Sequence, residues 1–265
     1  MGTLTHGSDL TLAPTIGVLL RSGLSFGGAI AKLGSLGLWA LQLDATVQGF
    51  RPRDLNHRAR RDLLATLTRS SFRAGGLDFL IPREHYTDPG LVDRAMEAAL
   101  SAIRLAADLG RLPVSLDLPA EALDAPVARA LVEAADRHGV AMVVHVSESP
   151  DRLGAWVEAV DLPALGAGLD PAAELALGRN PVDQANRWGV RLRGARLSDG
   201  PSGTGLGPSR RVVGRGALDV VSYRVALDLC GSLAGPVALD LQGLEDPLGA
   251  AQAAAQVWER AAFRV

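Results

Sequence analysis

Short apolar runs alternate with longer amphipathic stretches from one end of this 265-residue chain to the other. Alternation of this kind is typical of parallel strands that are each followed by a covering helix. The apolar runs predict strands at residues 15–20, 39–44, 77–82, 113–118, 140–146, 165–170, 193–199 and 237–241. The stretches between and after them predict helices at residues 29–36, 57–68, 91–109, 126–137, 151–160, 181–188, 218–229 and 247–263.

The number and length of these units favour a closed barrel. About eight strand–helix pairs in roughly 250 residues is the usual size of a (β/α)8 TIM barrel. No linker-like stretch interrupts the pattern, so residues 1–265 are expected to form a single α/β domain. The competing architecture is an open, doubly wound sheet, but no strand and glycine-rich turn near the N-terminus supports it. The glycines at 203, 205 and 207 follow the seventh expected strand, and we interpret them as a loop rather than a nucleotide site.

Charge and composition exclude several classes of function. The formal net charge is −2, so no overall bias favours nucleic acid or a membrane surface. Lys32 is the single lysine and falls in the first expected helix, which disfavours Schiff-base chemistry. Cys230 is the single cysteine, so no intrachain disulfide can form. No signal peptide or membrane-spanning run is seen, and a cytoplasmic location is expected.

Polar residues close most of the expected strands. In a parallel barrel these ends converge on one mouth, where active sites are built. Several buried carboxylates gathered there imply mutual pairing, a metal or a polar ligand. Each residue alone is better explained as a helix cap or an ion pair, whereas the set as a whole indicates a site. The residues are Gln42, Asp44, Asp117, His145, Asp170, Arg196, Asp199, Asp240 and Gln242, with His85 and Tyr86 in the loop after the third strand.

Several motifs in the second half of the chain resemble a known family. They are Gly-Leu-Asp-Pro at 168–171, Gly-Arg-Asn-Pro at 178–181, Arg-Leu-Ser-Asp at 196–199, Gly-Arg-Gly-Ala-Leu-Asp at 214–219 and Gly-Pro-Val-Ala-Leu-Asp at 235–240. Their order and spacing resemble those of xylose-isomerase-like TIM barrels, the sugar phosphate isomerases and epimerases. The resemblance implies a divalent metal, Mn, Mg or Zn, that polarises a sugar carbonyl while carboxylates move a proton at carbon.

The expected metal ligands are only partly present. The family places Glu, Asp, His and Glu on strands five to eight, where this chain has His145, Asp170, Arg196 and Asp240. Arginine cannot ligate a cation and carries a permanent positive charge. Two arrangements therefore stay open. Either His145, Asp170 and Asp240 form a three-ligand site with Arg196 turned towards substrate, or Arg196 takes the metal position and pairs with Asp170 and Asp240.

Two functions follow from these arrangements. One is a sugar or sugar-phosphate isomerase or epimerase with His145 or Asp240 as the catalytic base. The other is a catalytically degenerate barrel that binds a small polar or carbohydrate ligand or serves as an interaction scaffold. In either case His85, Arg196, Asp199 and Gln242 are expected to contact the ligand. The sequence does not determine the oligomeric state.

A few further features are interpreted more conservatively. A zinc-dependent DNA-repair endonuclease would need more ligands than five histidines offer and a basic stripe for phosphates. The arginines at 51, 53, 58, 60 and 61 are read as a solvated helix face rather than a phosphate site. Those at 210, 211 and 215 flank the glycine-rich loop, where barrels often bind phosphate.

Overall fold

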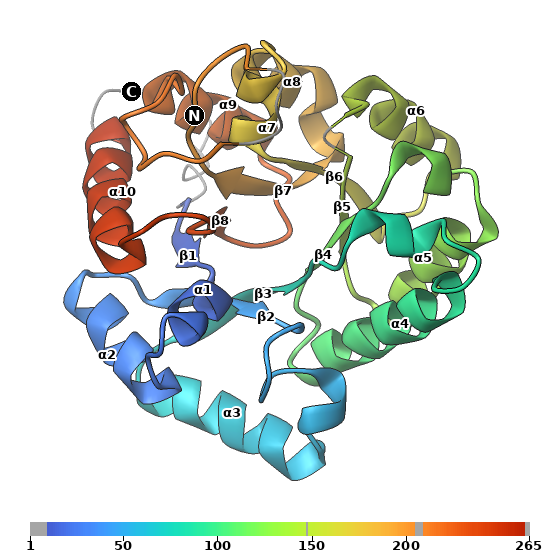
Figure 1. Ribbon diagram of the computed structural model, residues 1–265, viewed down its shortest axis with the longest axis horizontal. Coiled ribbons are helices and arrows are strands. Elements are labelled where there is room, and N and C mark those ends of the chain that lie inside the picture. The colour runs from blue at the N-terminus through green and yellow to red at the C-terminus, as the bar shows by residue number, and fades with distance from the viewer. Residues whose placement is uncertain (1–9, 147, 205–208, 263–265) are drawn as a thin grey trace, which may run out of the picture.

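A closed ring of eight parallel strands forms the centre of the molecule (Figure 1). The computed structural model describes residues 10–146, 148–204 and 209–262. Each strand pairs in parallel with its sequence neighbour from β2 to β8, and β8 pairs with β1. A parallel bridge between Thr15 and Gln42 joins β1 to β2 and closes the ring. The expectation of a TIM barrel is confirmed.

The eight strands are short, as is usual for the interior of such a barrel. They are β1 Leu12–Pro14, β2 Ala40–Asp44, β3 Arg73–Phe79, β4 Val114–Asp117, β5 Met142–His145, β6 Leu165–Leu169, β7 Leu192–Leu197 and β8 Val237–Leu239.

Helices surround the ring (Figure 1). Their apolar side chains pack with those of the strands into one buried core. They are α1 Ile16–Arg21, α2 Phe26–Ser35, α3 His57–Arg69, α4 Val92–Asp108, α5 Pro126–His138, α6 Pro150–Val160, α7 Pro171–Ala176, α8 Pro181–Trp188, α9 Val220–Cys230 and α10 Pro247–Ala262. No helix in the described part of the chain is long and apolar enough to cross a membrane.

The first expected strand, residues 15–20, is wrong. Residues 16–21 form helix α1, and the strand is the shorter segment before it. Ile16 and Leu19 lie about one helical turn apart, and both are buried. A short apolar run suits a helix and a strand equally well, so the sequence pattern did not distinguish the two. Gly17 lets α1 press against the end of β2, since a Cβ there would lie 2.2 Å from Asp44 Oδ2.

The third strand starts earlier than expected. The sequence places it at 77–82, whereas β3 runs from Arg73 to Phe79 and includes two glycines that read as a turn. Gly76 faces a polar side chain inside the barrel, because a Cβ there would come within 2.6 Å of Gln42 Oε1. The absent side chain therefore makes room for Gln42, and the shift brings Asp78 close to the carboxyl end of the strand.

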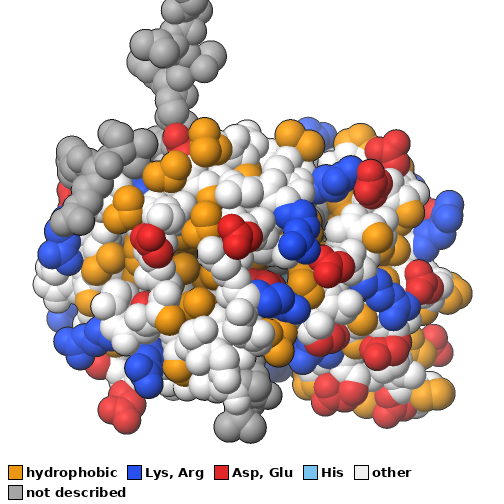
Figure 2. Space-filling model, turned by 90° about the horizontal axis from the view of Figure 1, so that it is seen from above, with side chains coloured by type: hydrophobic (Ala, Val, Ile, Leu, Met, Phe, Trp, Pro, Cys, Tyr) orange, Lys and Arg blue, Asp and Glu red, His pale blue; other side chains and the backbone are white. Residues whose placement is uncertain are grey.

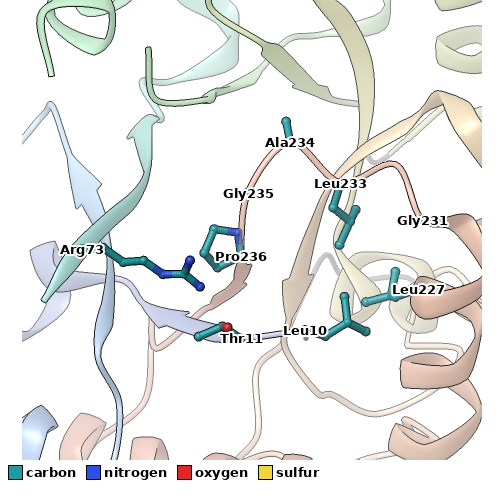
Figure 3. A pocket seen from close by; sticks show the side chains of 9 residues that line it. All are labelled: Leu10, Thr11, Arg73, Leu227, Gly231, Leu233, Ala234, Gly235 and Pro236. Carbon is teal, nitrogen blue, oxygen red and sulfur yellow. The ribbon is translucent and has the colours of Figure 1, made fainter. Parts of the chain in front are cut away.

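A small cavity of about 250 Å³ lies at the amino ends of the strands (Figure 3). It is lined by Leu10 and Thr11 before β1, Arg73 at the start of β3, and the loop that precedes β8. Active sites of TIM barrels form at the opposite end of the strands. This cavity is therefore not the candidate active site.

Candidate functional site

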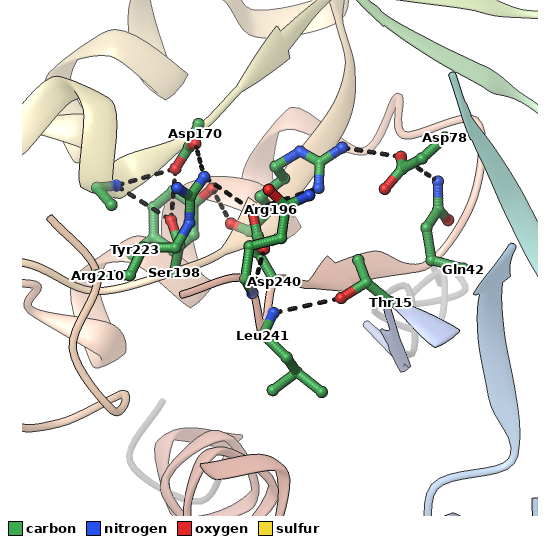
Figure 4. A network of polar contacts seen from close by, with 12 residues as sticks. Thr15, Gln42, Asp78, Asp170, Arg196, Ser198, Arg210, Tyr223, Asp240 and Leu241 are labelled. Atoms are coloured by element: carbon green, nitrogen blue, oxygen red, sulfur yellow. Dashed lines mark hydrogen bonds and ion pairs between the residues drawn. The ribbon is translucent and has the colours of Figure 1, made fainter. Parts of the chain in front are cut away.

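Two arginines and three aspartates form a buried ion-pair network at the barrel mouth (Figure 4). We call Asp78, Asp170, Arg196, Arg210 and Asp240 the mouth network. They come from β3, the ends of β6 and β8, β7, and the loop between β7 and α9. Opposite charges at this depth stabilise each other only when geometry is good, because removal from water is costly.

Arg196 lies at the centre of the network and is 4 % exposed. Its Nη2 donates to Asp78 Oδ1 at 2.8 Å, and its Nη1 lies 3.5 Å from Asp240 Oδ2. Gln42 Nε2 donates to the same Asp78 oxygen at 2.9 Å. Burial raises the pKa of Asp78, and Arg196 and Gln42 oppose this. Burial lowers the pKa of Arg196, but its aspartate partners outweigh burial and raise it, so the guanidinium stays charged.

Arg210 reaches the network from the loop between β7 and α9. Its Nη2 lies 2.8 Å from Asp170 Oδ2 and 2.8 Å from Asp240 Oδ2, so one nitrogen joins two strand ends. Asp170 is also the N-cap of α7, where its Oδ1 accepts from the Ala172 N–H at 3.1 Å and from the Ser198 hydroxyl. Asp170 therefore serves both as a helix cap and in an ion pair, the two explanations considered for a single strand-end residue.

Asp199 was expected to contact a ligand, but both oxygens of its carboxylate already accept hydrogen bonds from backbone N–H groups. It is 0 % exposed and accepts from the N–H groups of Gly200 and Leu218 on one oxygen and of Gly214 and Gly216 on the other, at 2.8–3.0 Å. A carboxylate offers about four lone pairs, and all are occupied here. Asp199 therefore closes the base of the loop that carries Arg210. The glycines at 205 and 207 lie outside the described residues.

Gln242 and His85, which were also expected to contact a ligand, lie in different parts of the structure. The backbone N–H of Gln242 donates to Asp240 Oδ1 at 2.9 Å, which places this residue beside the mouth network. His85 instead lines a groove between α3 and α4 that none of the mouth network lines.

The expected metal ligands do not fit a metal ion. Arg210 stands between Asp170 and Asp240, and Arg196 also lies against Asp240. Over residues 10–146, 148–204 and 209–262, no group of three His, Cys, Asp or Glu side chains is arranged to hold one. The arrangement with Arg196 among the carboxylates is the better description, with one correction. Its second partner is Asp78, and Asp170 pairs with Arg210 instead.

A second cluster lies beside the mouth network, on β4 and β5. Asp117 and His145 are register partners on these neighbouring strands. Burial raises the pKa of Asp117 to about 6, opposed by Arg83, whose Nε lies 3.7 Å from Asp117 Oδ2. Burial and then Arg196 lower the pKa of His145 to about 3, so its imidazole is neutral at pH 7. Burial and Asp117 raise the pKa of the Tyr86 hydroxyl.

Sequence reasoning missed two members of the mouth network. Asp78 falls early in its expected strand, because the strand was placed four residues too late. Arg210 was noted only as part of a loop that could bind phosphate. The only available signal concerns Arg210, since several strand-end carboxylates need more than one buried cation; it does not identify the partners, and no such signal marks Asp78.

The known structures that resemble this chain share its fold at low sequence identity. No family model and no curated protein matches it by sequence. A xylose isomerase domain protein from Planctomyces limnophilus aligns with a TM-score of 0.74 at 16 % identity, covering 96 % of each chain. A xylose isomerase-like TIM barrel protein from Mycobacterium smegmatis, solved with magnesium, gives 0.73 at 14 % identity over 97 % of this chain and 98 % of that one.

An enzyme of named activity is also similar. D-psicose 3-epimerase from Clostridium cellulolyticum H10, solved with D-tagatose, aligns with a TM-score of 0.70 at 14 % identity over 90 % of this chain and 94 % of that one. Together with the closed parallel ring, these matches establish the architecture. The chain has the fold of the xylose-isomerase-like TIM barrels.

Proposed function

We propose that the barrel mouth binds a small polyhydroxy ligand, such as a sugar, through the protein's own charged groups and without a divalent metal. The observation that carries this is a concentration of buried polar atoms that lack hydrogen bonds. Within the described residues, eight buried side-chain atoms have no hydrogen-bond partner, and five belong to Asp117, His145, Arg196, Arg210 and Asp240. Two of the five are nonetheless ion-paired, since Arg196 Nη1 and Asp240 Oδ2 lie 3.5 Å apart and Asp240 Oδ2 also lies 2.8 Å from Arg210 Nη2. The atoms of Asp117, His145 and Arg210 are therefore the clearest candidates for ligand contacts.

Such atoms are costly in a folded protein. An unsatisfied buried donor or acceptor costs about 1–3 kcal/mol, and most native proteins retain few. Asp117 Oδ1 is an acceptor, Arg210 Nε is a donor, and the Nδ1 of neutral His145 is either, depending on its tautomer. Hydroxyl groups both donate and accept. A polyhydroxy compound therefore matches this mixture better than a simple anion or cation does.

The similarity to D-psicose 3-epimerase supplies a first probe, D-tagatose. We expect isothermal titration calorimetry to detect binding of D-tagatose or another ketohexose, unchanged by a chelator. Asp117→Asn should weaken binding at least tenfold, because the amide replaces an acceptor oxygen with a donor. Asp93→Asn, on the exposed side of α4, is the matched control. Failure of all ketohexoses to bind, or equal affinity in Asp117→Asn, would contradict the proposal.

A second candidate is metal-independent epimerisation at the same mouth, and the raised pKa of Asp117 favours it. A carboxylate with a pKa of about 6 is a better base at pH 7 than an ordinary aspartate. Asp117 would take the proton from the carbon next to the carbonyl, and the resulting enediolate oxygen would face the Arg196 and Arg210 guanidinium groups. Delivery of a proton from water to the opposite face gives the epimer, and Asp117 returns to its carboxylate form by releasing its proton to solvent. Asp240, an expected base, is held by both arginines and suits this role less.

Solvent deuterium exchange tests this second candidate. In D2O, the active protein should incorporate deuterium at C3 of D-tagatose, as seen by proton NMR. Asp117→Asn should abolish the exchange, whereas Asp93→Asn should not change it. Binding of the sugar without any exchange would leave ligand binding as the function and remove epimerisation.

A further inference from the structure

A large groove separates α3 from α4 on the outside of the barrel, at the bottom of the view in Figure 1. Its volume is about 1170 Å³. Some neighbouring helices of the ring, such as α4 with α5 and α8 with α9, pack directly on each other, whereas α3 and α4 do not. Here the ends of β2 and β3 contribute Thr46 and Phe79 to the groove. It is therefore built by the chain's own strand ends and helices.

The face of α4 that lines the groove explains why α3 does not close it. Arg94, Ala98, Ser101, Arg104 and Asp108 recur at three- and four-residue steps and line the groove. These residues share one face of the helix, as such spacing requires. A face made of small and charged side chains offers no large apolar surface for α3 to bury. The groove is thus a property of the sequence of α4.

The charge in this groove is strongly one-sided. Five arginines line it, Arg51, Arg53, Arg60, Arg94 and Arg104, together with three histidines. The acidic residues that line it are Glu97 and Asp108, and Asp108 is ion-paired with Arg60. On the face seen in Figure 2, by contrast, acidic and basic side chains are interspersed.

Two of these arginines are held in place by backbone oxygens. Arg60 Nε donates to Leu55 O at 2.8 Å, and Arg51 Nε donates to Thr46 O at 3.0 Å. Bonds through Nε leave the terminal nitrogens of Arg51 as donors. His57, the first residue of the 13-residue helix α3, also lines the groove and brings the positive end of that helix dipole with it. The five arginines expected to form a solvated helix face therefore fall into two groups. Three of them line the groove, whereas Arg58 and Arg61 are exposed outside it.

We propose that this groove binds a small polyanion whose charge is carried by phosphate or carboxylate oxygens. Guanidinium groups present planar pairs of donors that match both kinds of oxyanion. Partly fixed guanidinium groups lose less side-chain entropy on binding than free ones. The site is separate from the barrel mouth, since none of the mouth network lines it.

Calorimetry with pyrophosphate and with citrate, each at constant ionic strength, tests the site and distinguishes its two chemistries. The test variant is Arg94→Gln/Arg104→Gln, on the exposed edge of the groove. The control is Arg61→Gln/Arg69→Gln, which removes the same charge from exposed positions on α3 that do not line the groove. Arg210→Gln, at the barrel mouth, is the second control.

We expect one of the two anions to bind, with at least a tenfold loss of affinity in the groove variant. Both controls should bind within about twofold of the natural protein. The tighter anion identifies whether phosphate or carboxylate is preferred. Three results would overturn the proposal: no binding of either anion, an equal loss in the α3 control, or loss of binding in Arg210→Gln.

Discussion

Arg210 places one nitrogen 2.8 Å from two carboxylates that belong to different strand ends. Its side chain is 16 % exposed, whereas the carboxylate side chains of Asp170 and Asp240 are 11 % and 1 % exposed. Such shielded charges interact more strongly than surface pairs. At the residue scale, the mouth is therefore held by a cation that comes from a loop rather than from a strand.

Replacing Arg210 by glutamine should destabilise the fold, because it leaves two buried carboxylates with less positive charge. We expect a loss of about 2 kcal/mol in the free energy of unfolding, below the usual cost of breaking a fully buried pair. Urea denaturation measures it. Arg211→Gln, at the exposed neighbouring residue, should change stability by less than about 0.5 kcal/mol. Equal stability of the two variants would show that Arg210 does not hold the mouth.

Asp117 predicts how stability depends on pH. Burial raises its pKa from 3.8 to about 6 in the folded protein, so the folded state binds this proton more tightly than the unfolded state. The contribution of Asp117 is then most favourable below pH 4 and is lost as the pH rises to about 6. Asp117→Asn should remove this loss. Urea denaturation between pH 4 and 7 should show the variant gaining stability relative to the natural protein as the pH rises, and parallel profiles would contradict the assignment.

The loop between β7 and α9 shows how a single residue organises a whole element. Asp199 accepts four backbone N–H groups from both ends of this loop, and its own carbonyl accepts from Arg211 N at 2.8 Å. Arg210 is adjacent to that anchor. The position of its guanidinium between two carboxylates therefore depends on Asp199, although the two side chains have different roles.

Asp199→Asn should loosen this loop. The amide keeps one acceptor oxygen and presents an NH2 group to two backbone N–H groups that lose their partners. Each unsatisfied buried N–H costs about 1–3 kcal/mol, so we expect a loss of about 3 kcal/mol in unfolding free energy. Hydrogen exchange should also show faster exchange at Gly214 and Gly216. A loss below about 0.5 kcal/mol with unchanged exchange would exclude this role.

Elements with clear helical periodicity could be predicted from the sequence, whereas two strands could not be placed. Residues 91–109 and 126–137 were expected as helices, and α4 and α5 occupy those positions. The first strand failed because its apolar run suits a helix equally well. The third was displaced because Gly75 and Gly76 lie inside the barrel, where the facing side chains of Pro236 and Gln42 require glycine.

At the scale of the whole molecule, the ring of strands determines which residues meet, and side-chain reach determines how they pair. Strand-end reasoning identified Asp170, Arg196 and Asp240, and the closed barrel does bring them to one mouth. It could not show that Arg196 pairs with Asp78 or that Arg210 bridges Asp170 and Asp240. Those pairings depend on strand register and loop conformation, and the Arg196–Asp78 pair joins residues that are 118 positions apart in the sequence.

Because both Arg196 and Arg210 lie against the carboxylates at the mouth, a test of metal binding has to replace both arginines. Arg196→His alone restores a neutral ligand type, but Arg210 would still lie between Asp170 and Asp240. We therefore expect no stoichiometric Mn or Zn in Arg196→His. In Arg196→His/Arg210→Gln, the carboxylates lose both cations and face a histidine, which is a ligand set suited to Mn or Zn. Calorimetry with MnCl2 and ZnCl2 should detect binding by the double variant, and binding should disappear when Asp170→Asn is added. Metal bound equally by the natural protein, or by neither variant, would show that the arginines are not what excludes the ion from this barrel.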